Sequence, residues 1–142
     1  MNVVIDVSGI AEILFKKEKC EKFHKAVSEA SAVLAPDIYI SELTNTLWKY
    51  KVKNIFTGNE CIQFIRYGIS FVDTFINSNE IWQEAFSEGI KNNHSIYDMF
   101  YFVCARRNNA VLVTSDSDLA EICKKHKIPV IYPSISGACP IR

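Results

Sequence analysis

The sequence predicts an α/β fold in which a parallel sheet of four to five strands is covered by helices on both faces. Three observations support this class. Short apolar, β-branched runs alternate along the chain with longer stretches whose apolar residues recur at helical spacing. The strand-like runs are not joined by the tight Asn-Gly or Asp-Gly turns that mark hairpins. Parallel strands need long crossover connections, and the helical stretches supply them.

The length of the chain favours one domain. A chain of 142 residues can bury roughly 70% of the surface that it exposes when unfolded, which is enough for a substantial core. We expect this domain to span residues 1–133 and an irregular C-terminal tail to cover residues 134–142. The sequence contains no repeat, linker or low-complexity segment that would divide it.

The N-terminal part of the chain predicts two strands separated by helices. Residues 3–6 form a short apolar run that is typical of a strand buried on both faces, and Asp6 ends it. Ser8-Gly9 breaks this run, and helical spacing follows over residues 10–30. We expect the second strand over residues 32–35.

Two further helices and a weaker strand follow. Asp37 can cap the first of these helices, because a side-chain oxygen at this position satisfies free backbone N–H groups. Its apolar residues at helical spacing are Ile40, Leu43, Leu47 and Trp48. Thr57 and Glu60 have the spacing of a capping box, which predicts a helix over residues 57–70. A strand over residues 70–75 has less support.

The C-terminal half repeats the alternation. Residues 80–90 predict a helix, and its apolar residues, expected to face the core, are Ile81, Trp82, Ala85 and Phe86. Residues 95–98 open the next helix, and residues 110–113 form the clearest late strand. That strand leads through residues 114–118 into a last helix, and residues 128–132 predict the final strand.

Composition limits the function classes. With 16 Lys plus Arg against 16 Asp plus Glu, the chain lacks the bulk positive charge that drives nonspecific nucleic-acid binding, so any nucleic acid must bind at a local site. The five cysteines include no Cys-x-x-Cys pair, which argues against a zinc ribbon or a disulfide framework and favours reduced thiols. We expect no leader peptide, because no charged-then-apolar segment opens the sequence, and no apolar run approaches about 18 residues. We therefore expect a cytoplasmic protein without a membrane span.

Two carboxylates stand at the ends of predicted strands. Asp6 closes the first strand, and Asp116 lies just past the late strand. In open parallel sheets, ligands bind in the crevice outside the carboxyl ends of the strands. Each carboxylate also has a hydroxyl residue nearby, Ser8 and Thr114, which can orient it or a bound water.

Two further acids lie on predicted helices. Glu42 lies one turn into its helix with Asn45 three residues later, and Asp98 lies in the first turn of another helix. We expect these acids to converge with Asp6 and Asp116 at one edge of the sheet. Like charges at close range oppose one another's ionisation, and a hard divalent cation such as Mg²⁺ or Mn²⁺ offsets this repulsion. Such an ion can activate water against a phosphodiester.

Simpler interpretations of these acids remain open from the residues alone. Asp98 stands three residues after Ser95, which is the spacing of a capping-box partner. Asp116 and Asp118 have first-turn positions that the helix dipole favours, and Glu42 could be an ordinary solvated helix residue. Asp6 is harder to explain without a function, because it ends an apolar strand.

The chain resembles PIN-domain ribonucleases of the VapC toxin type. The resemblance spans residues 3–132 and rests on four segments in order, namely Val3-Val4-Ile5-Asp6-Val7-Ser8, Ala35-Pro36 through Ser41-Glu42-Leu43-Thr44-Asn45-Thr46-Leu47-Trp48, Tyr97-Asp98, and Leu112-Val113-Thr114-Ser115-Asp116-Ser117-Asp118-Leu119. It implies a three-layer α/β/α, PIN-like domain with Rossmann-like topology.

The resemblance also implies an activity and partners. The activity would be a metal-dependent endoribonuclease that hydrolyses RNA with one or two Mg²⁺ or Mn²⁺ ions. Asp6, Asp98 and Asp116 would approach the metal most closely, Glu42 would hold it directly or through water, and Asp118 would be an extra acidic ligand. A homodimer and a cognate antitoxin protein are the implied partners. The alternatives are a housekeeping RNA-processing PIN nuclease and a non-catalytic α/β binding domain.

Basic and aromatic residues could support RNA binding. Arg106, Arg107 and Lys49 could contact RNA phosphates around the acidic edge, although solvated helix faces explain them equally well. Trp48 and Tyr97 could stack on bases, but core positions are the stronger expectation. A histidine, His94, could donate a proton to the leaving oxygen, against the simpler interpretation of a loop residue.

Overall fold

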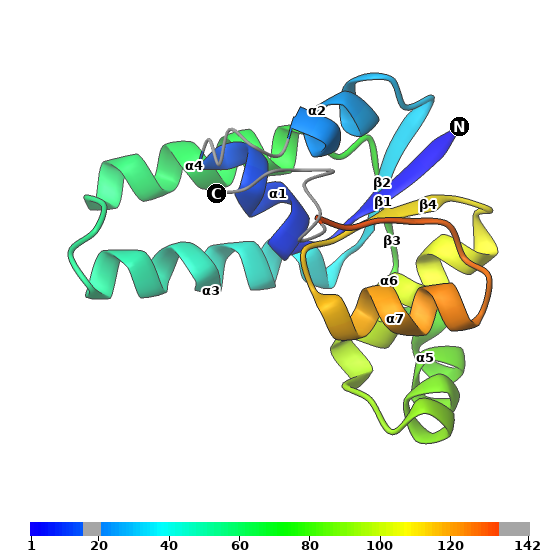
Figure 1. Ribbon diagram of the computed structural model, residues 1–142. Helices are drawn as coiled ribbons and strands as arrows, with labels where there is room; N and C mark the ends of the chain where they lie inside the picture. Colours follow the sequence, from blue (N-terminus) through cyan, green and yellow to red (C-terminus); the bar gives the residue numbers. More distant parts are fainter. Residues whose placement is uncertain (16–20, 134–142) are drawn as a thin grey trace.

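The computed structural model describes residues 1–15 and 21–133, and a five-stranded parallel sheet forms its centre (Figure 1). The strands are β1 (Asn2–Ile5), β2 (Ala32–Pro36), β3 (Thr74–Ile76), β4 (Val111–Val113) and β5 (Val130–Ile131). Their order is β3-β2-β1-β4-β5, and all four pairings are parallel. The central strand is β1, in which Val4 pairs with Leu34 on one side and Leu112 on the other.

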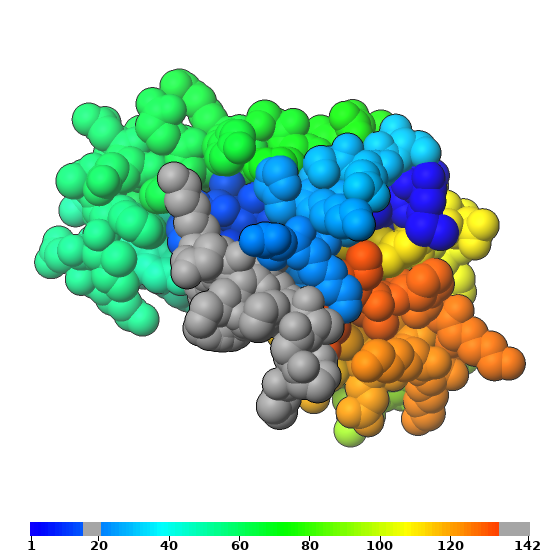
Figure 2. All heavy atoms as spheres, turned by 45° about the horizontal axis from the view of Figure 1, so that its top comes forward, coloured from blue at the N-terminus to red at the C-terminus, as the bar shows by residue number. Residues whose placement is uncertain are grey.

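The described residues hold seven helices, namely α1 (Val7–Leu14), α2 (Glu21–Ser28), α3 (Ile38–Val52), α4 (Gly58–Ser70), α5 (Ser78–Asn92), α6 (Ile96–Arg107) and α7 (Ser117–Lys125). The helices α1 to α4 pack on one another, whereas α6 packs on α5, α7 and the strands β1, β2 and β4 (Figure 1). In a second view, the hairpin of α3 and α4 forms one end of the molecule (Figure 2). The three-layer α/β/α fold expected from the sequence is thus confirmed.

The core surrounds β1, β4 and α6. Val4, Ile5, Leu112 and Val113 are fully buried, which explains why these strands are continuous apolar runs in the sequence. In α6, residues 99 and 101–105 are all buried, because this helix lies between the sheet and its two neighbours. Three free thiols, Cys61, Cys104 and Cys123, pack in this interior as small apolar groups.

The helix α1 begins at Val7, three residues before the helical spacing expected from residue 10, so Ser8 and Gly9 belong to the helix. Both residues lie in its first turn, because the Asp6 side chain caps the helix by accepting a hydrogen bond from Gly9 N. A Cβ at position 9 would lie 2.7 Å from the backbone oxygen of Val113. Glycine here therefore allows α1 to pack against the end of β4 instead of interrupting the helix.

Two capping predictions have opposite outcomes. Thr57 and Glu60 form the expected capping box at the start of α4. The expected cap of α3 by Asp37 is wrong, because its side chain makes no bond to that helix. Asp37 instead accepts hydrogen bonds from the backbone N and the Oγ of Ser78, which tie the starts of α3 and α5 together.

The expectation that several large apolar residues face the core is also wrong. Trp82 and Phe86 on α5 are 53% and 56% exposed, and Trp48 on α3 is 59% exposed. The inward face of α5 is formed by Ile81, Ala85, Glu88 and Gly89. Glu88 is buried there because the guanidinium of Arg106 pairs with its carboxylate.

Smaller differences concern the ends of elements. The weakly supported strand exists as β3, but it begins four residues later than expected, because Ser70 still belongs to α4.

No helix in residues 1–15 and 21–133 is long and apolar enough to cross a membrane. The predicted tail over residues 134–142 lies outside the described residues.

Candidate active site

The candidate site lies where the sheet changes its direction of growth. The chain proceeds from β1 to β2 on one side, and it later returns to add β4 and β5 on the other side of β1. This reversal places a crevice at the carboxyl ends of β1 and β4, which is where open α/β sheets bind ligands. Asp6 follows β1 directly, and Thr114, Ser115 and Asp116 follow β4.

The carboxylate of Asp6 is buried and held through both oxygens. Its Oδ1 accepts hydrogen bonds from Ser8 Oγ and from Gly9 N, each at 2.7 Å, and its Oδ2 accepts one from Thr114 Oγ1. Burial raises the pKa of Asp6 to about 7, although these three hydrogen bonds act to lower it. The neighbouring Asp98 carboxylate raises this pKa further.

Two hydroxyl groups link the ends of β1 and β4 through Asp6. Ser8 Oγ also accepts a hydrogen bond from Ser115 N at 2.8 Å, and Thr114 Oγ1 accepts one from Asp116 N at 3.0 Å. Each hydroxyl has a single proton, and both protons are directed at the Asp6 carboxylate. The ends of the two strands are therefore fixed around this one acid.

Glu42 reaches the crevice from α3. The phenol of Tyr101, which is buried on α6, donates a hydrogen bond of 2.6 Å to Glu42 Oε1. Burial raises the pKa of Glu42, the Tyr101 hydrogen bond opposes this rise, and the Asp98 charge adds to it. Tyr101 is not among the site residues expected from the sequence. The available signal was its hydroxyl group, which usually needs a partner when it is buried.

Asp98 lies in the first turn of α6 and does not cap it. Ser95 makes no side-chain cap bond, so the alternative of a Ser95–Asp98 capping box is wrong. The Oδ2 of Asp98 instead lies 2.8 Å from Nε2 of His94. Burial raises the pKa of Asp98, the His94 hydrogen bond lowers it, and the charge of Asp116 raises it again.

Asp116 has a structural role as well as a place in the crevice. Its Oδ1 accepts hydrogen bonds from the backbone N of Asp118 at 2.9 Å and of Leu119 at 3.1 Å, so it caps α7. Asp118 is exposed, and its charge contributes to the raised pKa of Asp98. Asp118 is not among the residues that line the crevice.

The four acids line one cavity of about 270 Å³. The lining residues are Asp6, Val7, Ser8, Glu42, Asn45, Thr46, Lys49, Asp98, Tyr101 and Asp116. Their convergence agrees with the sequence analysis, as does the presence of Asn45. Among these residues Lys49 carries the one basic side chain.

The expected position of Arg106 and Arg107 beside the acids is wrong. Both lie in the last turn of α6, eight or more residues after Asp98, which corresponds to about 12 Å along a helix. They form ion pairs with Glu84, and Arg106 also pairs with Glu88. Their side chains therefore hold α6 against α5.

The donor set of the cavity suits a hard divalent cation. It consists of carboxylate oxygens, and burial and a neighbouring carboxylate charge raise the pKa values of Asp6, Glu42 and Asp98, so a cation would relieve this repulsion. In residues 1–15 and 21–133, no three Asp, Glu, His or Cys side chains are placed to hold one ion directly. Both oxygens of Asp6 already accept hydrogen bonds. The residues thus fit an ion that keeps several water ligands, as Mg²⁺ does.

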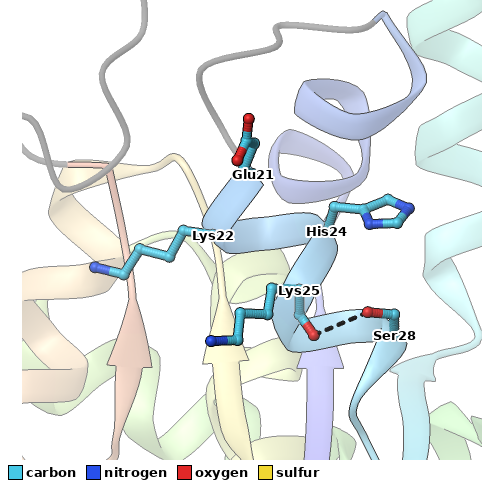
Figure 3. A pocket seen from close by; sticks show the side chains of 5 residues that line it. All are labelled: Glu21, Lys22, His24, Lys25 and Ser28. Carbon is cyan, nitrogen blue, oxygen red and sulfur yellow. Dashed lines mark hydrogen bonds between the residues drawn. The ribbon is translucent and has the colours of Figure 1, made fainter.

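A second hollow lies on α2 and has a different character (Figure 3). It is lined by Glu21, Lys22, His24, Lys25 and Ser28, all from this one helix. The side chains of Lys22 and Lys25 point to the same side and that of His24 points away from them (Figure 3). Since no other described element contributes to the lining, this hollow lacks the convergence seen at the acidic crevice.

Comparison with known proteins assigns the family. A protein-family model described as the PIN domain matches residues 3–125, and the chain therefore belongs to the PIN-domain family. It is 28% identical over 123 residues to Ribonuclease VapC3 of Pyrobaculum aerophilum, a match that covers 85% of this chain and 94% of that protein. The resemblance to VapC-type PIN proteins found in the sequence is thus confirmed.

A solved structure supports the fold. The crystal structure of PAE2754 from Pyrobaculum aerophilum superimposes with a TM-score of 0.68 at 22% sequence identity, covering 92% of this chain and 83% of that one. At this identity the similarity concerns the fold alone.

Proposed function

We propose that the protein is a Mg²⁺- or Mn²⁺-dependent endoribonuclease that hydrolyses RNA phosphodiesters with one or two ions. The observation that carries this proposal is the convergence of four carboxylates, Asp6, Glu42, Asp98 and Asp116, in one crevice at the carboxyl ends of β1 and β4. An acidic cavity without a cation would repel a phosphodiester. The family assignment and the ribonuclease name of a relative support the same activity.

The bound ion would supply a water molecule of lowered pKa and would neutralise charge on the leaving oxygen. The residues of the chain hold the acids in place before the ion arrives. Asp6 is fixed by three hydrogen bonds, Glu42 by Tyr101, and Asp116 by its cap on α7. This preorganisation matters because a site that is already arranged needs no costly rearrangement when the reaction begins.

Lys49 is the residue best placed to contact an RNA phosphate. It lies two turns after Glu42 on α3 and lines the acidic cavity, and its side chain is exposed. A phosphate that approaches the acids would meet this ammonium group at the rim. Contacts of this kind position the RNA without reading its bases.

We further propose that the protein is the toxin of a toxin–antitoxin pair, acts in the cytoplasm, forms a homodimer and is inhibited by a cognate antitoxin protein. The VapC name of its relative supports this role. Exposed apolar side chains on α3 and α5, among them Trp48, Trp82 and Phe86, offer surfaces that a protein partner would bury. A housekeeping RNA-processing nuclease with the same site is the second candidate, and an antitoxin gene immediately upstream or growth arrest on expression in cells would favour the toxin.

The direct test is the Asp6→Asn variant. Asparagine keeps the shape and the capping oxygen of Asp6 but removes its charge, so we expect cleavage of RNA to fall by at least a hundredfold while the fold is retained. Cleavage by the wild-type protein should stop in excess chelator and return when Mg²⁺ or Mn²⁺ is added. Growth arrest on expression, relieved by Asp6→Asn, would favour the toxin role.

The matched control is Glu29→Gln, which removes an exposed carboxylate at the end of α2. It should cleave RNA at the wild-type rate. Full activity of Asp6→Asn, or cleavage by the wild-type protein that persists in chelator, would exclude the proposed mechanism.

A further inference from the structure

We infer that His94 is a positioning residue that holds the Asp98 carboxylate in the orientation needed for the cation. This inference rests on the proposed metal-dependent activity and adds a residue to its site. His94 Nε2 lies 2.8 Å from Asp98 Oδ2, and the two side chains are 17% and 27% exposed. Because a carboxylate only accepts hydrogen bonds, Nε2 of His94 carries the proton and donates the hydrogen bond to Asp98.

The backbone around His94 is fixed by tight packing between α5 and α6. Asn93 ends α5 in the left-handed conformation, with φ 49° and ψ 52°, and turns the chain back toward the crevice. The backbone N of His94 then donates a hydrogen bond of 3.1 Å to the carbonyl of Gly89. The imidazole is therefore carried by a well-defined turn.

Gly89 makes this turn possible. A Cβ at position 89 would overlap Cδ1 of Ile96 and would lie 3.2 Å from the carbonyl oxygen of His94. Any other residue at position 89 would therefore require the Ile96 side chain and the carbonyl of His94 to shift. The packing that joins the two helices thus also places the imidazole beside Asp98.

Asp98 needs such a donor more than Asp6 and Asp116 do. Asp6 is held through both oxygens and Asp116 is held by two backbone N–H groups, but among the described residues only His94 donates a hydrogen bond to Asp98. Asp116, Asp118 and Asp6 all act on it as like charges. Without the His94 N–H group, the side chain of Asp98 would be free to rotate away from them.

The arrangement leaves the second oxygen of Asp98 for the cation. Oδ2 is engaged by His94 on one side, while Asp98 itself lines the acidic cavity. Tyr101 holds Glu42 in a comparable way, with one donor to one carboxylate oxygen. Donors of this kind orient metal-binding groups, and their loss commonly weakens metal binding by roughly 10- to 100-fold.

The test compares His94→Leu, which removes the donor, with His94→Gln, whose amide nitrogen stands the same number of bonds from Cα as Nε2. Mn²⁺ binding is measured by calorimetry, and kcat and KM are measured for cleavage of an RNA oligonucleotide. We expect His94→Leu to bind Mn²⁺ at least about tenfold more weakly, with a lower kcat and little change in KM. His94→Gln should stay within about threefold of the wild-type protein.

The control is His126→Gln. His126 lies near the same helix pair, where its Nε2 contacts Asn92 Oδ1 at 3.1 Å, but it does not line the cavity. This variant should match the wild-type protein in all three measurements. If His94→Leu does not fold, judged by thermal unfolding without metal, His94→Ala serves as the donor-free variant.

The outcomes separate the two proposals. If the wild-type protein binds no Mn²⁺, both the proposed function and the role of His94 are overturned. If the wild-type protein binds Mn²⁺ and the donor-free variant binds it equally well, only the role of His94 is overturned. An equal loss of affinity in His94→Gln would also overturn it, because the N–H donor would then not be the feature that matters.

Discussion

At the scale of single residues, Asp6 combines a structural task with a chemical one. Its carboxylate caps α1, binds the hydroxyl groups at the ends of β1 and β4, and forms the floor of the acidic cavity. Burial makes its charge unfavourable, and the three hydrogen bonds offset this only in part, which is why its pKa rises to about 7. The site therefore holds a carboxylate whose ionised form is unfavourable for folding, a cost that the proposed cation would offset.

The unfavourable burial of the Asp6 charge predicts how the stability of the protein depends on pH. Between about pH 4 and pH 7 folded Asp6 keeps a proton that the unfolded chain has released, so the free energy of unfolding should fall as the pH rises. Asp6→Asn lacks this titration. In chelator at about pH 8 we expect the variant to be more stable than the wild-type protein, by at most roughly 4 kcal/mol, with a difference that shrinks toward about pH 4.

Urea unfolding of both proteins at several pH values measures this difference. The asparagine of the Asp6→Asn variant can still accept the bond from Gly9 N and can donate to Thr114 Oγ1, so loss of the cap should not obscure the result. A variant that is less stable than the wild-type protein at the alkaline end of this range would contradict the expectation, because ionised Asp6 would then stabilise the fold.

At the scale of elements, the close contact between α1 and β4 builds the floor of the site. The strands β1 and β4 are neighbours, and α1 starts at the end of β1. Gly9 lets this helix approach the carbonyl of Val113. The approach brings Ser8 within reach of Ser115 N, which joins the two strand ends. Because Gly9 has no side chain, α1 can approach β4 closely enough for the hydroxyl groups of Ser8 and Thr114 to contact Asp6.

We expect Gly9→Ala to destabilise the protein by about 1–3 kcal/mol, because the new methyl group would meet a backbone oxygen that cannot move easily. Gly58→Ala is the matched control. It lies at the start of α4, and the nearest atom to a Cβ there is Lys51 Cε at 4.0 Å, so this change should be neutral or slightly stabilising. Chemical unfolding of both variants measures the difference. Equal stabilities would show that α1 can shift away from β4 at little cost.

At the scale of the whole molecule, balanced charge limits how the protein can bind RNA. The chain carries as many acidic as basic residues, and four of its acids line the cavity that is the proposed site for a phosphodiester. Binding should therefore depend on a few local contacts and on the cation. A shallow dependence of RNA affinity on salt concentration follows, because few counterions are released.

The Lys49→Gln variant tests whether Lys49 contacts an RNA phosphate. Removing one phosphate contact should lower the magnitude of the slope of log affinity against log salt by about 0.7 for single-stranded RNA. The measurement uses the non-cleaving Asp6→Asn background and fluorescence anisotropy at several salt concentrations. Lys124→Gln, an exposed lysine in the last turn of α7, is the control and should leave the slope unchanged. Equal slopes for both variants would place the phosphate contact elsewhere.

The strands and several helix boundaries could be predicted because they depend on local patterns. Apolar runs as short as Val3–Ile5 and Val111–Val113 indicate strands buried on both faces, and Thr57 with Glu60 specifies a helix start through its own hydrogen bonds. The predictions for Trp82 and Phe86 failed because both faces of α5 offer large apolar residues. Periodicity alone cannot decide which face a helix buries. Packing against α6 decided it, because α6 covers the face that carries Ile81, Ala85 and the Arg106-paired Glu88.

The sequence predicts the position of two of the four acids, and the tertiary structure decides the position of the other two. The sequence alone determined that Asp6 and Asp116 follow strands of a parallel sheet, since the strand pattern and the position of each acid are local facts. Only the tertiary structure decided that Glu42 and Asp98 reach the same cavity, that Tyr101 and His94 contact them, and that Arg106 and Arg107 pair with Glu84 instead. Such contacts join residues that are distant in the chain or depend on how α5 and α6 pack, and no local pattern encodes that packing.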